Sequence, residues 1–78
     1  MTLKIISSDS ILYEGEATSV TLPGTLGLFT VLDHHASLIS TLTAGTIVFT
    51  TDNGQQQSRE ITGGLVDVDN NVVSVCLY

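Results

Sequence analysis

The chain has 78 residues, of which 42% are apolar and 13% charged, and its eight acidic side chains against two basic ones give a formal charge of −6. This length supports one small domain over residues 1–78, and so apolar a composition excludes a disordered segment. Because nucleic acids and anionic membranes are bound through clustered cations, the charge also excludes nucleic-acid partners and disfavours membrane binding.

The N-terminal segment MTLKIISSDS lacks the marks of an export signal. Its short apolar run is interrupted by Lys4 and followed by Ser7, Ser8 and Asp9. No stretch reaches the roughly 18 consecutive apolar residues of a membrane span, so we expect no direct membrane insertion. The single cysteine, Cys76, can form no internal disulfide, which favours a cytosolic environment over secretion.

Alternation of apolar and polar residues predicts β-strands along most of the chain. In TSVTLP, Val20 and Leu22 fall on one face of a strand. The next segment, PGTLG, holds the only proline and two glycines and suits a tight turn. In HHASLISTLTAG a few apolar residues have near-helical spacing, but the serines and threonines favour a turn followed by a strand.

Two hairpins are predicted in the second half of the chain. The pair Asn53-Gly54 lies between strand-like runs and suits a type I′ turn, since both residues tolerate a positive φ. Asn70-Asn71 suits the same turn less well, because neither residue is glycine. Between the hairpins, Gly63-Gly64 predicts a bulge or a close approach of two backbones. This spacing of strands and turns predicts an all-β, antiparallel sandwich or barrel.

The adjacent histidines His34 and His35, preceded by Asp33, are the candidates for a metal site. Successive side chains on a strand point to opposite faces, so the two histidines would not converge on one ion. No further histidine or cysteine stands at ligand spacing. We therefore predict no metal and no cofactor, with one histidine exposed and the other capping or packing the loop.

Other catalytic arrangements are weaker still. No serine lies in a sharp elbow beside an oriented base, and no phosphate-binding lysine follows the glycines. Glu14 and Glu16 share a face of a strand, which is typical of a solvated surface that discourages edge pairing. Cys76, between Val75 and Leu77, is predicted to be a small packed residue. We predict no catalytic residue.

The segment from Leu26 to Leu32 holds more large apolar residues than alternation can bury on one face. Two interpretations stay open. In the first, part of the segment, with Leu26 and Leu28 as its leading members, forms an exposed patch for another protein. In the second, the segment plugs one end of a thin sandwich.

The stretches YEGEATSVTLPGTLGLFTVLDHHASLISTLTAGTI and TGGLVDVDNNVVSV resemble the N-terminal domain of the epsilon subunit of F-type ATP synthase. The chain departs from that pattern at Leu28, often polar or acidic in the family, at Thr30, commonly glycine, at Asp33, commonly proline, and in reading HASL for HAPL. The positions shared with the family's pattern are Gly15, Val20, Leu22 to Gly24, Gly27, His35, Ala36, Leu38, Leu42, Gly45, Gly63 and Gly64.

The resemblance implies a flattened antiparallel β-sandwich of roughly eight to ten short strands. It implies a non-catalytic subunit of the central rotor, which docks on the gamma subunit and the c-ring and couples proton translocation to ATP synthesis. It would be peripheral, at the cytoplasmic face of the bacterial inner membrane. By position, the c-ring-facing residues would be Thr25, Leu26, Gly27 and Leu28, and the gamma-facing residues Ser7, His35 and Ser40.

The family usually continues into two C-terminal helices that can restrain ATP hydrolysis and, in some members, bind ATP. Because the sequence ends at Tyr78, directly after a predicted strand, we expect neither property of it. A rival hypothesis is a small cupin-like enzyme with a metal at His34 or His35. A carbohydrate-binding sandwich is disfavoured by the absence of Trp and by only two Tyr.

Overall fold

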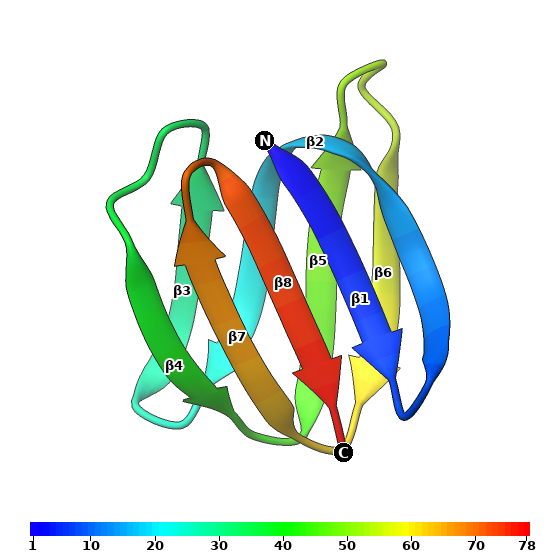
Figure 1. Ribbon diagram of the computed structural model, residues 1–78, viewed down its shortest axis with the longest axis vertical. Coiled ribbons are helices and arrows are strands. Elements are labelled where there is room, and N and C mark those ends of the chain that lie inside the picture. The colour runs from blue at the N-terminus through cyan, green and yellow to red at the C-terminus, as the bar shows by residue number, and fades with distance from the viewer.

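Two layers of β-strands form the domain, and one long strand belongs to both (Figure 1). A computed structural model describes residues 1–78 and contains no helix that could cross a membrane. The eight strands are β1 (Thr2–Ser7), β2 (Ser10–Gly24), β3 (Gly27–Leu32), β4 (Leu38–Leu42), β5 (Gly45–Thr51), β6 (Gln56–Ile61), β7 (Gly64–Asp69) and β8 (Val72–Leu77).

The front layer contains β4, β7, β8 and β1, followed by residues 10–16 of β2. The back layer contains β3, the rest of β2, β5 and β6. The predicted all-β sandwich is therefore confirmed, although β2, with 15 residues, is not a short strand.

One pair departs from the predicted antiparallel arrangement. β1 and β8 pair in parallel, from Thr2 opposite Val72 to Ser7 opposite Leu77. These strands come from the two ends of the chain, so no hairpin forces them to run in opposite directions. Both begin at the same end of the front layer (Figure 1).

Apolar side chains from both layers fill the space between them. The alternation in β7 and β8 turns four valines inward, all at most 1% exposed, and the ring of Phe49 packs 4.6 Å from that of Tyr13. Burying a side chain of this size stabilises the fold by about 1.5–3 kcal/mol. The core residues are Met1, Leu3, Ile5, Ala17, Val20, Leu22, Val31, Leu42, Ile47, Phe49, Ile61, Val66, Val68, Val73 and Val75.

The same alternation places Cys76 on the outer surface. Val73 and Val75 point inward, so Ser74 and Cys76 point outward, and the thiol is exposed. The prediction of a packed Cys76 is therefore wrong.

Both predicted hairpins exist, but the two-residue turn is in the second one. Asn70 and Asn71 have φ values of 50° and 61°, as a type I′ turn requires, and they connect strands paired up to Asp69 and Val72. At Asn53-Gly54 the ladder stops at Thr50 and Gln56, and only the glycine has a positive φ.

A buried side chain explains the wider first hairpin. Thr51 is 9% exposed, and its hydroxyl accepts a hydrogen bond from the backbone N–H of Gln55 at 3.2 Å and contacts the side chain of Asn53. A threonine that bonds the local backbone in this way competes with the ladder for its hydrogen bonds. The predicted type I′ turn at Asn53-Gly54 is therefore replaced by a five-residue connection over residues 51–55.

The β3–β4 loop is tied to the corner of β2 by the first residue. The amino group of Met1 donates to the carbonyl of Ala17 at 3.1 Å and to the carboxylate of Asp33 at 2.5 Å. The hydrogen bond from this ammonium is the largest cause that holds the pKa of Asp33 below its ordinary value, and desolvation by burial opposes it. The charges of the ammonium and His34 and a hydrogen bond from Asn71 lower the pKa further.

Gly64 marks the predicted close approach of two backbones. A Cβ there would overlap the carbonyl of Cys76 and lie 3.2 Å from Cα of Leu77. We expect Gly64→Ala to lower the free energy of unfolding by about 3 kcal/mol, because backbone atoms cannot move aside as a side chain can. Chemical denaturation would measure it, with the exposed Thr62→Ala as control. A Gly64→Ala protein as stable as this control would contradict the packing described.

Replacement of Asp33 should show a pH-dependent loss of stability. A carboxylate with a lowered pKa in the folded state stabilises the fold above its unfolded pKa, and this contribution disappears as the pH falls through the folded value. Asp33→Asn should therefore melt below the wild type at pH 7 and approach it near pH 2. Thermal unfolding at both pH values measures this, with Asp9→Asn, in the exposed β1–β2 turn, as control. An equal difference in melting temperature between the wild type and Asp33→Asn at both pH values would refute the contact between Asp33 and the amino group of Met1.

Candidate docking surface

β3 and β4 lie at the same side of the sandwich, one in each layer, and do not pair with each other (Figure 1). A shallow depression of ≈ 380 Å³ follows the gap between these two edge strands. We call this depression the edge groove, and half of its lining is apolar. It is lined by Leu26, Gly27, Leu28, Phe29, Thr30, His35, Leu38 and Ser40.

Two leucines, Leu26 in the β2–β3 turn and Leu28 at the start of β3, point away from the protein at one end of the groove. Leu26 is 104% exposed and Leu28 is 73% exposed, so neither contributes to the core. The turn itself is fixed, because Thr25 donates its N–H to the carbonyl of Thr41 at 3.1 Å and the two hydroxyls lie 2.8 Å apart. The leucines are therefore presented on a backbone anchored to both layers.

Each of the two interpretations left open by the sequence is correct for part of the apolar segment over residues 26–32. Leu26 and Leu28 are exposed, as the patch hypothesis predicts. Val31 is buried in the core, and Phe29 is half-buried against it, as the plug hypothesis predicts. The inward alternation of β3 thus closes the sandwich while its turn remains available for contact.

Five of the seven predicted contact residues line the edge groove. Leu26, Gly27 and Leu28 come from the predicted c-ring side, and His35 and Ser40 from the predicted gamma side. Thr25 lies in the adjoining turn. Ser7 is not brought to the groove, since it ends β1, and β8 and β7 separate that strand from β4.

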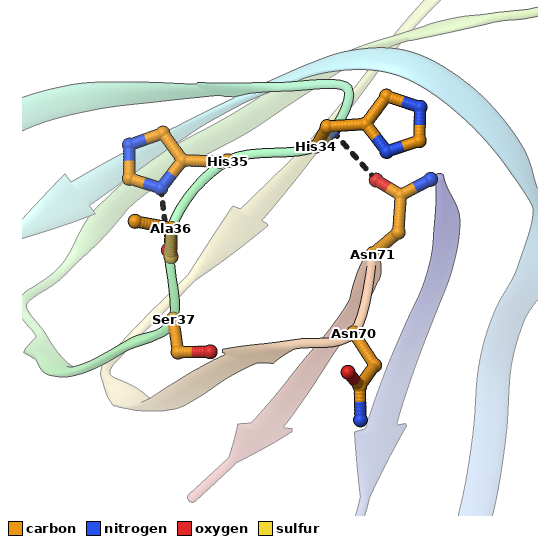
Figure 2. Close-up of a pocket in the computed structure, with 6 residues that line it drawn as sticks. All are labelled: His34, His35, Ala36, Ser37, Asn70 and Asn71. Carbon is orange, nitrogen blue, oxygen red and sulfur yellow. Dashed lines mark hydrogen bonds between the residues drawn. The ribbon is translucent and has the colours of Figure 1, made fainter.

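The histidines lie in the loop between β3 and β4, not on a strand, and both are exposed. His34 has a positive φ of 62°, and in Figure 2 the two rings point in opposite directions. A ring nitrogen of His35 lies 2.7 Å from the carbonyl oxygen of Ala36. No group of three His, Cys, Asp or Glu side chains is arranged to hold a metal, so nothing favours the cupin-like hypothesis.

The contacts that hold this loop come from residues that the sequence did not single out as part of a site. Asn71 Oδ1 accepts a hydrogen bond from the backbone N–H of His34 at 2.8 Å (Figure 2). The hydroxyl of Ser37 donates to Asp69 Oδ1 at 2.7 Å. The partners are separated by 37 and 32 residues, so no local spacing could identify them.

Comparison with known proteins agrees with this architecture. The family described as the ATP synthase, Delta/Epsilon chain, beta-sandwich domain matches residues 1–77. The ATP synthase epsilon chain of Sulfurimonas denitrificans is 44% identical over 73 residues, which cover 94% of this chain and 56% of the relative. That of Stenotrophomonas maltophilia is 41% identical over 71 residues, covering 91% and 51%. The chain thus spans about half the length of these curated relatives.

Solved structures share the fold at lower identity. A chain in the Euglena gracilis mitochondrial ATP synthase, a structure of OSCP, F1 and c-ring, aligns with a TM-score of 0.90 and 21% identity over 96% of this chain and 48% of that one. A chain in the central stalk and c-ring of the Tetrahymena thermophila enzyme aligns with a TM-score of 0.78 and 13% identity over 97% and 61%. With the family match over residues 1–77, the chain belongs to the family of the ATP synthase delta/epsilon-chain β-sandwich domain.

Proposed function

We propose that this domain is a non-catalytic part of the central rotor of an F-type ATP synthase, docked on the gamma subunit and the c-ring. Its curated relatives are ATP synthase epsilon chains, and it shares its fold with a chain in a central stalk and c-ring structure. Its role would be mechanical. By turning with both partners, it would help to couple proton translocation to ATP synthesis.

The exposed leucines at the end of the edge groove carry this proposal. On so small a domain, large side chains left in water at Leu26 and Leu28 are typical of a surface that a partner covers. We assign the turn over residues 25–28 to the c-ring. His35, in the β3–β4 loop, and Ser40, in the middle of β4, are the polar residues assigned to gamma.

Ser7, which the family resemblance also assigns to the gamma contact, lies outside the edge groove and stays a prediction. It lies at the end of β1, which β8 and β7 separate from β4 in the front layer. A gamma subunit that touches both His35 and Ser7 would have to extend across the front layer. The distance between these positions makes Ser7 a separate test of how far the interface reaches.

The proposed location follows from the partners and the charge. The domain would sit peripherally at the cytoplasmic face of the bacterial inner membrane, held there by the rotor. A formal charge of −6 disfavours direct binding to anionic lipids, because like charges repel.

Co-purification with the gamma subunit of the same organism tests the proposal. We expect the two proteins to co-elute in gel filtration, and His35→Ala or Ser40→Ala to weaken the complex. Gln57→Ala provides the matched control, since it is exposed on β6 of the back layer. Separate elution of the wild-type proteins across a range of salt concentrations would refute the proposed role.

Replacement of Leu28 tests the c-ring assignment. Because its side chain is 73% exposed, Leu28→Asp should change the free energy of unfolding by no more than about 0.5 kcal/mol. Binding of the domain with gamma to the detergent-solubilised c-ring should weaken by roughly tenfold, as expected for the loss of a central apolar contact.

Ile11→Asp is the control for Leu28→Asp. Ile11 is 62% exposed near the start of β2, away from the edge groove, and its replacement should leave c-ring binding unchanged. Thermal melting of both variants distinguishes the explanations. A Leu28→Asp protein that unfolds in isolation would show that Leu28 belongs to the core, and equal binding by the two variants would refute the c-ring assignment.

A further inference from the structure

The loop that brings His35 to the edge groove is held by the turn between β7 and β8 (Figure 2). The amide oxygen of Asn71 accepts the backbone N–H of His34 at 2.8 Å. Three residues further along the loop, Ser37 donates its hydroxyl to Asp69 at 2.7 Å. Both contacts join this loop to the β7–β8 hairpin, one at its turn and the other at the end of β7.

The type I′ turn gives its two asparagines different roles. Both have a positive φ, but Asn70 is exposed and its side chain points away from the loop, whereas Asn71 is half-buried and points toward His34 (Figure 2). The backbone of Asn71 is fixed as well, because its carbonyl accepts the N–H of Thr2 at 3.0 Å. The amide oxygen of Asn71 is therefore held in place before any partner binds.

His34 needs such a contact because of its own conformation. Its φ of 62° is a left-handed conformation, which is sterically unfavourable for a residue other than glycine. The hydrogen bond to Asn71 holds the N–H of this residue, and the N–H of His35 donates to the carbonyl of Leu32 at 3.2 Å. Together these bonds set the direction in which the chain leaves the turn.

We propose that Asn71 is a positioning residue of the docking surface. Its amide oxygen holds His34 in the left-handed conformation, and this fixes the direction from which His35 enters the edge groove. Asn71 does not line the groove, so it acts through the loop and not by touching the partner there. The inference rests on the proposed docking of gamma at His35 and adds a residue to that site.

The two asparagines provide a matched pair of variants. Asn70→Gly and Asn71→Gly each remove one amide side chain, and glycine tolerates the positive φ at both positions. Only Asn71→Gly removes the hydrogen bond to His34. We expect it to speed hydrogen exchange of the His34 amide by roughly tenfold, as the loss of one hydrogen bond predicts, and to weaken gamma binding by about fivefold. Asn70→Gly should stay within about twofold of the wild type in both measurements.

A double-mutant cycle with His35→Ala tests whether Asn71 acts through His35. If it does, Asn71→Gly should weaken gamma binding in the wild-type background and have little further effect when His35 is already alanine. Additive effects of the two replacements would overturn the positioning role.

The remaining outcomes separate this inference from the proposed function. Faster exchange at His34 with unchanged gamma binding would refute the inference and leave the rotor role standing. Equal weakening by Asn70→Gly and Asn71→Gly would attribute the effect to the turn as a whole and refute the inference too. A wild-type domain that does not bind gamma would refute the proposed function, and with it any docking role of Asn71.

Discussion

The passage of β2 from one layer to the other is the constraint on which the rest of the structure depends. Residues 10–16 pair with β1 in the front layer, and residues 17–24 pair with β5 and β3 in the back layer. At the corner Ala17 is 1% exposed and exchanges backbone hydrogen bonds with Met1. Because one strand belongs to both layers, they cannot slide past each other, and the edges of β3 and β4 are brought to the same side. The edge groove is a consequence of that path.

Unpaired edge strands are normally a hazard, because their free N–H and C=O groups can pair with other chains. Here the exposed edges of β3 and β4 are short and stand in separate layers, and the side chains of Leu26, in the β2–β3 turn, and Leu28, at the start of β3, are exposed beside them. The proposed partners would therefore meet side chains rather than add a strand. Within each layer the strands are already joined by their own ladders, which contain 40 of the 48 backbone hydrogen bonds of the domain, and this fits the mechanical role proposed for it.

Local patterns account for what the sequence predicted. The alternation of Val66 with Val68 and of Val73 with Val75 predicts both strands and their inward faces. The errors arise where a contact between residues far apart in the sequence, or a buried side chain, determines the local structure. No local signal indicates that the two ends of the chain pair in parallel, or that a buried Thr51 widens the first hairpin. Cys76 is exposed because Val73 and Val75 occupy the inward positions of β8, so the prediction of a packed thiol is wrong. The candidate docking residues were transferred from a family pattern, and only the fold brings five of them into one groove.

The two ends of the edge groove differ in chemistry, and this difference suits the proposed docking of two partners on one domain. The turn end offers Leu26 and Leu28, whose burial supplies affinity without strong directional demands. The loop end offers His35, and β4 adds Ser40 between the two ends; their polar groups supply orientation more than affinity. Between them runs β3, hydrogen-bonded to β2 over its whole length. The two ends are therefore joined by a strand that cannot bend independently of β2, and a rigid connection of this kind fits the coupling role proposed for the domain.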